Sequence, residues 1–170
     1  TIVKKDAAGN DANTPEEAVD LTTSRGATAI VFDVVNSGTE PLIGIAVSDA
    51  TTAGSGTLTD LVCTFPDDTT GTTWAGPFAP GDTFSCTGQL AGVIAGQDHT
   101  NVATVQGQGQ NTGTTVSDED PYNATVVPTT PGVTVVKKDA LGNDANTTQE
   151  AVDLTAKRGA VGIVFEVVNS

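Results

Sequence analysis

The sequence predicts an all-β protein, an antiparallel β-sandwich of about seven strands that is repeated in tandem. Three observations support this fold class. Aromatic residues make up only 4% of the chain, whereas Thr, Val, Asp and the 19 glycines are frequent, a composition typical of short strands joined by turns. Apolar and polar residues alternate along several segments, as in strands with one buried face. Finally, a long segment near the start of the chain occurs a second time near its end.

The repeated segment defines the domain organisation. Residues 1–37 recur as residues 134–170 at a constant offset, and 28 of the 37 positions are identical. A period of this length matches a whole domain rather than a short solenoid repeat. We therefore expect residues 1–132 to form a complete repeat and residues 133–170 to form the first strands of the next. About 38 residues cannot enclose a core alone, so the second copy must either belong to a longer array or be completed by another molecule.

The individual strands follow from alternation and turn signals. The pattern is clearest in 83–90, where Phe84, Cys86 and Leu90 share one face. The segment 29–35 is almost continuously apolar, as expected of a central strand, and 126–132 contains two prolines, which favour a short, semi-rigid linker. The expected strands are 2–5 with 18–21, 28–36, 42–48, 57–64, 83–90, 100–107 and 114–127. Antiparallel strands at this spacing predict two packed sheets with Ig-like architecture.

The charge of the chain narrows the classes of partner. Twenty-one acidic and seven basic residues give a formal net charge of −14. Such a surface repels nucleic acid and anionic lipid, so no nucleic acid partner is expected, and any membrane attachment is expected to lie outside this stretch. The chain contains Ser, Asp and one histidine, His99, but nothing that resembles a nucleophile elbow. We therefore expect no enzymatic activity.

The two cysteines, Cys63 and Cys86, both lie inside the first repeat. A single pair in an acidic, Thr-rich chain indicates a structural disulfide formed in an oxidising, extracellular compartment. The alternative is two free buried thiols. A zinc site is not expected, because His99 is the only histidine and no further cysteine is present.

An acidic, Asn-rich segment opens each copy of the repeat. Carboxylate and amide oxygens gathered on a turn suit Ca²⁺, although the segment is not an EF-hand, because Ala8 stands at its third position and Asp11 where the sharp turn needs Gly. Asp118 and Asp120 come shortly before the linker, so we expect calcium at the junction with the following copy. The candidate ligands are Asp6, Asn10, Asp11, Asn13, Glu17, Asp118, Asp120, Asp139, Asn143 and Asp144. The alternative is that these residues only form turns.

Four segments resemble the conserved repeat domain of prokaryotic surface proteins. They are VVNSGTEPLIGIAVSD (34–49), FAPGDTFSC (78–86), TNVATVQG (100–107) and VSDEDPYNATV (116–126). The resemblance implies an Ig-like β-sandwich that occurs in tandem within very large adhesins, stalks and extracellular fibres. It implies no catalytic residues.

The expected function is therefore a structural extracellular module that builds a cell-surface stalk, adhesin shaft or filament, with neighbouring copies of the repeat as partners and possible stiffening by Ca²⁺. Two alternatives stay open. The second copy can act as a donor strand for another subunit of a non-covalent filament, through Ile163, Val164, Phe165 and Val167. The repeat can also be a ligand-binding adhesin domain that uses the loop 71–80. A further hypothesis is a covalent isopeptide bond from Lys4 or Lys5 to Asn123, assisted by Asp33.

Overall fold

The computed structural model describes residues 1–155 and 160–169 and confirms the all-β fold class. The chain divides into two compact units, Thr1–Pro128 (unit 1) and Thr129–Ser170 (unit 2), so the boundary falls inside the expected linker 126–132. The helical segments η1 (Pro15–Glu17) and η2 (Thr148–Glu150) are short 3₁₀ turns. Within the described residues, no helix is long and apolar enough to cross a membrane.

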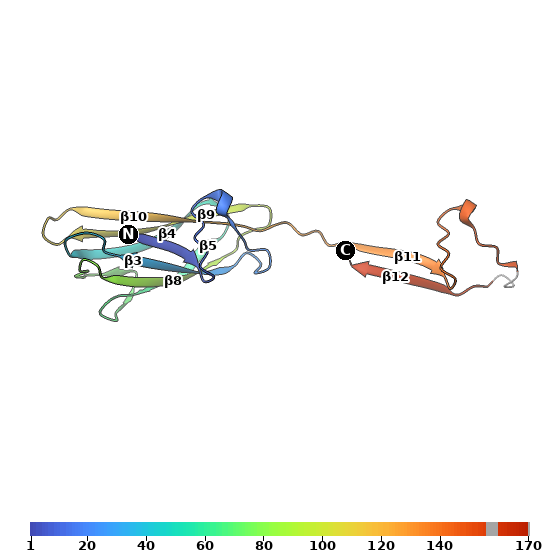
Figure 1. Cartoon of the computed structure of the whole chain (residues 1–170), viewed down its shortest axis with the longest axis horizontal. Helices are drawn as coiled ribbons and strands as arrows, with labels where there is room; N and C mark the ends of the chain where they lie inside the picture. Colours follow the sequence, from blue (N-terminus) through green and yellow to red (C-terminus); the bar gives the residue numbers. More distant parts are fainter. Residues whose placement is uncertain (156–159, 170) are drawn as a thin grey trace. The chain divides into compact units, whose positions relative to one another are not determined.

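Unit 1 consists of two five-stranded sheets (Figure 1). In chain order, its strands are β1 (Ile2–Asp6), β2 (Val19–Asp20), β3 (Thr28–Val35), β4 (Leu42–Gly54), β5 (Thr57–Thr64), β6 (Thr70–Gly71), β7 (Thr73–Trp74), β8 (Thr83–Ala91), β9 (Asp98–Gly109) and β10 (Thr115–Thr125). The first sheet has the order β1-β3-β8-β5-β6, and the second has the order β2-β10-β9-β4-β7. Neighbouring strands are antiparallel, except for the short parallel pair of β10 and β2.

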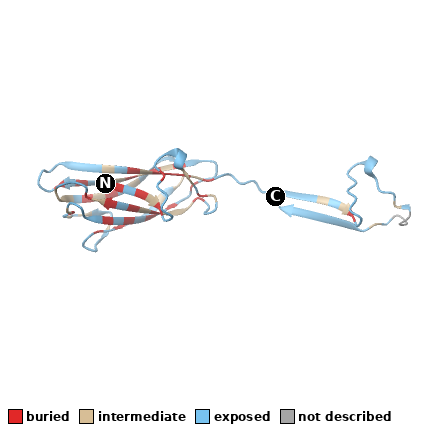
Figure 2. Cartoon of the chain, in the orientation of Figure 1, coloured by how far each residue is buried: buried red, intermediate tan, exposed pale blue. Residues whose placement is uncertain are grey.

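The core lies between these two sheets. Along β8, buried and exposed residues alternate without interruption, which places Phe84, Cys86 and Leu90 on the inner face as the sequence pattern predicts (Figure 2). Phe32 from β3 and Tyr122 from β10 are fully buried among them. Because each inward side chain is covered by the opposite sheet, burial of this apolar surface is the main force that holds the two sheets together.

Two features differ from the sequence prediction. The segments near 2–5 and 18–21 do not act together, because β1 pairs with β3 in the first sheet whereas β2 pairs with β10 in the second. Strand β4 also continues to Gly54, well past the expected end at residue 48. Residues 49–54 carry no apolar alternation that could have predicted a strand, but the long strand β9 supplies backbone partners across a register shift between Thr51 and Ala53.

Unit 2 contains the strands β11 (Val133–Asp139) and β12 (Ile163–Asn169), which form an antiparallel pair. Residues 156–159 and Ser170 of the expected second copy lie outside the described residues. The pairing repeats that of unit 1, because Val135 lies opposite Val167 as Ile2 lies opposite Val34. The apolar side chains of β12 are exposed, in contrast to those of β3 (Figure 2).

Candidate functional site

The cysteines form the expected disulfide. Cys63 of β5 and Cys86 of β8 lie directly opposite each other in the strand register, are bonded through their sulfurs and are buried. The bond therefore joins two neighbouring strands of one sheet, not the two sheets. It closes a loop with a sequence separation of 23 residues. The disulfide restricts the conformations of the unfolded chain. In the folded state it holds β5 against β8.

The acidic segment forms a turn that is organised by Asp6. One carboxylate oxygen, Oδ1, accepts hydrogen bonds from the backbone N–H groups of Ala8 and Asn10, both at 2.9 Å. The other oxygen, Oδ2, accepts from Asn10 Nδ2 at 2.8 Å and from the hydroxyl of Tyr122 at 3.3 Å. Burial alone would raise the pKa of Asp6, but these hydrogen bonds together lower it below its usual value. The carboxylate of Asp6 is thus occupied by the turn.

The second copy forms the same turn without the rest of the sandwich. Asp139 Oδ1 accepts from the N–H groups of Leu141 at 2.8 Å and Asn143 at 2.9 Å, and Oδ2 accepts from Asn143 Nδ2 at 2.8 Å. Hydrogen bonds from the side chain and backbone of Asn143 lower the pKa of Asp139. The turn is therefore a local property of the sequence. Glu17 of the first copy also acts locally, because its Oε2 accepts from the N–H of Thr14 at 3.0 Å.

Asp118 and Asp120 hold strand β1 against the second sheet. Both lie on β10, where Asp118 Oδ2 accepts a hydrogen bond from the backbone N–H of Ile2 at 2.9 Å and Asp120 Oδ2 accepts one from the N–H of Lys4. Burial and the nearby charges of Asp11 and Asp118 raise the pKa of Asp120, although its bond to Lys4 opposes this. These two carboxylates therefore act inside unit 1, as side-chain partners for N–H groups at the edge of the first sheet.

The structure does not gather the candidate calcium ligands into one site. Asp6, Asn10 and Glu17 serve the first turn, Asp139 and Asn143 serve the second, and Asp118 and Asp120 anchor β1. Asp11, Asn13 and Asp144 are exposed. Among residues 1–155 and 160–169, no group of three or more His, Cys, Asp or Glu side chains is arranged to hold a metal ion. Calcium binding stays a prediction.

A second polar cluster, which the sequence analysis did not identify, lies between the sheets. Lys4 of β1 is completely buried, and its amine Nζ donates to Asp49 Oδ2 of β4 at 2.6 Å and to the backbone oxygen of Asn101 of β9 at 3.1 Å. The amide nitrogen of Asn101, Nδ2, donates to the other oxygen of Asp49, Oδ1, at 2.7 Å. One buried carboxylate thus contacts an amine from one sheet and an amide from the other. We call Lys4, Asp49 and Asn101 the buried triad.

The side chains of Lys4 and Asp49 are shielded from solvent. The Lys4 side chain is 0% exposed and that of Asp49 is 3% exposed, and the amine lies 5.8 Å from the ring centroid of Phe32. Burial lowers the pKa of Lys4 to about 8, against the opposing attraction of Asp49. His99 is also buried, and its Nδ1 donates to the backbone oxygen of Ser55 at 2.6 Å. Two further buried atoms, His99 Nε2 and Asn101 Oδ1, have no hydrogen-bond partner among the described residues.

Of the residues first considered for a covalent cross-link, only Lys4 belongs to the buried triad. Lys5 pairs with Asp33 on the exposed face of the first sheet. Asn123 donates to the backbone oxygen of Ala12 at 2.8 Å and accepts from Thr100 at 2.7 Å. The expected bond from Lys4 or Lys5 to Asn123 is therefore wrong, because Asn123 contacts neither lysine. Only Lys4 offered a sequence signal, because it occupies an inward position of an alternating strand. Asp49 and Asn101 are distant in the sequence, so only the fold brings them to Lys4.

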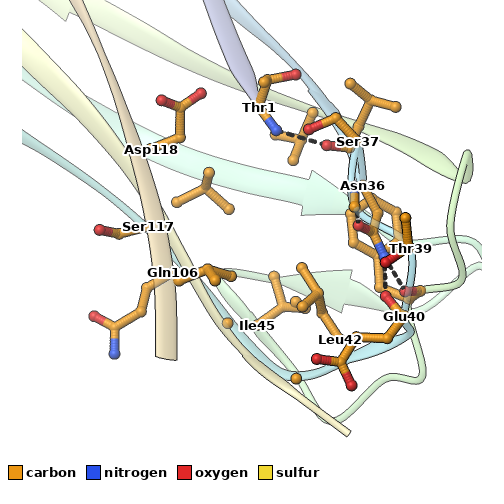
Figure 3. Close-up of a pocket in the computed structure, with 18 residues that line it drawn as sticks. Thr1, Asn36, Ser37, Thr39, Glu40, Leu42, Ile45, Gln106, Ser117 and Asp118 are labelled. Carbon is orange, nitrogen blue, oxygen red and sulfur yellow. Dashed lines mark hydrogen bonds between the residues drawn. The ribbon is translucent and has the colours of Figure 1, made fainter. Parts of the chain in front are cut away.

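A shallow groove of about 380 Å³ lies where the end of β3 and the start of β10 approach the start of β4 (Figure 3). Its floor is apolar and includes Leu42 and Ile45. The most buried polar side chain in its wall, Asn36, donates to the backbone oxygens of Glu40 at 3.0 Å and Phe78 at 2.8 Å. Asn36 therefore secures the loop between β3 and β4 and is not available to a ligand.

The loop 71–80 was the alternative candidate for ligand binding. Its Trp74 is half-buried and stacks on Phe65 at a ring-centroid distance of 5.3 Å. The indole nitrogen Nε1 donates to Asp67 Oδ2 at 2.9 Å, and the ring also meets Phe78 edge-on at 6.2 Å. Trp74 is thus a part of the aromatic cluster at this end of the core, and its polar atom already has a partner.

No protein-family model matches the chain, and a search of curated proteins also finds no match. Among solved structures, the chain is similar to the collagen-binding domain of a Staphylococcus aureus adhesin, with 14% identity, a TM-score of 0.41 and coverage of 75% of this chain and 97% of that chain. It is also similar to domains D2 and D3 of the major pilin SpaD from Corynebacterium diphtheriae, with 17% identity, a TM-score of 0.37 and coverage of 85% and 56%. A family 123 glycoside hydrolase from Clostridium perfringens gives 6% identity, a TM-score of 0.29 and coverage of 75% and 27%. These identities and TM-scores are too low to assign a function to this chain.

Proposed function

We propose that this chain is a structural module of an extracellular stalk, adhesin shaft or filament, in which β-sandwich units follow one another along the polypeptide. The observation that carries this proposal is the repeated segment. Both copies fold into the same strand pair with the same register and the same Asp-centred turn. A polypeptide that encodes one local structure twice, at the spacing of a whole unit, is organised as units in series.

The properties of unit 1 suit a load-bearing part outside the cell. The disulfide requires an oxidising compartment, and it closes its loop inside the first sheet. Most backbone groups are paired in two long-stranded sheets, which leaves few sites for proteolytic cleavage. The net charge of −14 favours solubility of a long polymer. A disulfide, paired strands and a soluble surface suit a mechanical role.

Immunogold electron microscopy tests this proposal. Antibodies raised against residues 1–128 would be applied to intact cells of the organism that makes the protein. We expect gold particles along projections or fibres outside the cell, and a native polypeptide much longer than 170 residues on a denaturing, reducing gel. Labelling confined to the cell interior would contradict the proposal.

The exposed face of β12 favours a second candidate, a non-covalent filament in which a second copy of the chain covers this face. Phe165 is 62% exposed, whereas Phe32, its counterpart in unit 1, is 0% exposed. Ile163, Val164 and Val167 are exposed beside it. An apolar face of this kind is typical of strands that are completed by another chain.

Light scattering after size-exclusion chromatography separates this candidate from a covalent array. If a second copy covers β12, the 170-residue chain associates as its concentration rises, and Phe165→Asp abolishes the association. Val116→Asp, which adds the same charge at an exposed apolar position of β10, is the matched control and should leave association unchanged. A chain that stays monomeric at high concentration contradicts the non-covalent filament and leaves the array of covalently linked units.

Calcium is a separate proposal. The candidate ligands whose oxygens the turns do not use are Asp11, Asn13, Asp118, Asp120 and Asp144. Asp118 and Asp120 each have a second oxygen that accepts no hydrogen bond from β1. Thermal unfolding with millimolar Ca²⁺ and then with chelator tests this, because a ligand of the native state raises the midpoint. If these carboxylates bind the ion, the double variant Asp11→Asn with Asp118→Asn loses the rise of the midpoint. If the midpoint is the same with Ca²⁺ and with chelator, the calcium proposal is wrong.

A further inference from the structure

The buried triad joins the two sheets of unit 1 through side chains alone. Asp49 and Asn101 are diagonal neighbours on the inner face of the second sheet, because Thr51, two residues after Asp49, lies opposite Asn101. Lys4 reaches them from β1 of the first sheet. We infer that Lys4 and Asn101 form an intramolecular isopeptide bond, with Asp49 as the group that moves the proton between their nitrogens.

The contacts place the reacting groups as this reaction requires. The nucleophile is the amine Nζ of Lys4, the acceptor is the side-chain amide of Asn101, and each nitrogen touches one oxygen of the same carboxylate, at 2.6 Å and 2.7 Å. Nζ also contacts the backbone oxygen of Asn101 at 3.1 Å, so the amine is held against the residue that it attacks. Groups fixed in this way react as if their concentration were very high.

The balance of atoms and protons is simple. The unprotonated Nζ attacks Cγ of Asn101, and a new Nζ–Cγ bond forms while the Cγ–Nδ2 bond breaks. The carboxylate of Asp49, which contacts both nitrogens, takes one proton from Nζ and passes that proton to the departing Nδ2, which leaves as ammonia. The amine and the primary amide become one secondary amide plus ammonia, and Asp49 ends in its starting state. No oxidant, reductant or cofactor is consumed.

The surroundings support each part of this step. Burial lowers the pKa of Lys4 to about 8, so a useful fraction of the amine is unprotonated near neutral pH, as a nucleophile must be. The buried oxygen Asn101 Oδ1, where negative charge would develop, has no partner in the described residues, and neither has the buried His99 Nε2. Asn101 is among the groups that act on the pKa of His99, so the ring lies beside this amide.

The alternative role of the buried triad is an ordinary buried ion pair. Such a pair is costly, because removing two charges from water offsets much of their attraction. An ion pair between Lys4 and Asp49 also does not explain why the amide of Asn101 donates to the second oxygen of Asp49 while its own oxygen Oδ1 is buried without a partner among the described residues. A covalent bond removes the amine charge, and it links β1 to β9 permanently, so a pull on the start of unit 1 is carried directly to the second sheet.

Mass spectrometry of the full chain tests the inference. Under denaturing and reducing conditions, the wild-type chain is expected to be lighter than its sequence mass by one ammonia. A protease digest should contain a branched peptide that joins the segment of Lys4 to the segment of Asn101. The chain carries its own control, because Lys137, the counterpart of Lys4 in the second copy, is exposed and should be recovered in a linear peptide.

Variants identify the chemistry. Lys4→Met and Asp49→Asn should restore the full mass, whereas Lys5→Met, which changes only the exposed neighbour that pairs with Asp33, should keep the loss of ammonia. Circular dichroism of each variant shows whether it folds, and the branched peptide of the wild type decides the question independently of the variants. Full mass in the folded wild type overturns the inference. A loss of ammonia that persists in Lys4→Met also overturns it, because it assigns the loss to another asparagine.

Discussion

Replacing Phe32 by Ala tests whether the repeat packs as described, because the chain contains the same residue in a second, unpacked setting. Phe32 lies in β3 between Lys4 of β1 and Cys86 of β8, and its side chain is 0% exposed. Its counterpart in unit 2, Phe165, is 62% exposed. Phe32→Ala and Phe165→Ala therefore make one chemical change in nearly identical local sequence, and only the burial differs.

The expected cost follows from that burial. Removing a fully buried Phe side chain loses its transfer free energy and leaves a cavity, together about 3–5 kcal/mol. A domain of this size has a free energy of unfolding of about 5–15 kcal/mol, so the loss is a large fraction of the total. With a urea dependence of about 2 kcal/mol per molar, the midpoint of Phe32→Ala falls by about 2 M. Phe165→Ala is expected to change it by less than about 0.3 M, as for exposed substitutions.

Urea unfolding followed by Trp fluorescence is a suitable assay. Trp74 is the only tryptophan and stacks on the core residue Phe65, so its signal reports unit 1 alone. Equal midpoints for Phe32→Ala and the wild type would refute the packing argument. So would a loss in Phe165→Ala as large as that in Phe32→Ala, because the exposed hairpin would then have to contribute to the core of unit 1.

Three further predictions concern the disulfide, the turn and the backbone. Reduction of the Cys63–Cys86 disulfide is expected to lower the melting temperature by the equivalent of about 3 kcal/mol, and a melt with and without reductant measures this. Hydrogen bonds lower the pKa of Asp6 although burial opposes them, so the stability that this carboxylate adds is present above its usual pKa of about 4 and is lost as the pH falls through the lower folded value. Asp6→Asn should therefore melt below the wild type at neutral pH, and the two melting curves should converge in acid; parallel curves would contradict this. Gly54→Ala should destabilise far more than Gly9→Ala in the same melts, because both residues have positive φ but only at Gly54 would a Cβ meet a β9 carbonyl oxygen, at 1.5 Å; equal losses would show that backbone strain alone matters.

Local patterns were sufficient for most of the fold. The alternation in 83–90 and the apolar segment 29–35 became β8 and β3 within one or two residues, because the period of burial in a strand is written directly in the sequence. The paired cysteines of unit 1 formed their disulfide. The end of β4 was missed because polar residues 49–54 are in a strand only through their partner β9.

The candidate functional residues depend less on local sequence and more on the tertiary structure than the strands do. The Asp-centred turn forms twice from the same short segment, so the sequence alone determines it, and the contacts that both copies share are made within four residues. The buried triad depends on three strands from two sheets, and no local pattern connects Lys4 with Asp49 or Asn101. The local sequence likewise does not determine the burial of this phenylalanine, since Phe32 is buried in one copy and Phe165 is exposed in the other. The sequence by itself thus determined strands, turns and the repeat, because these depend on neighbours along the chain. Only the tertiary structure decided which side chains meet, because burial and long-range contacts exist only when the second sheet covers the first.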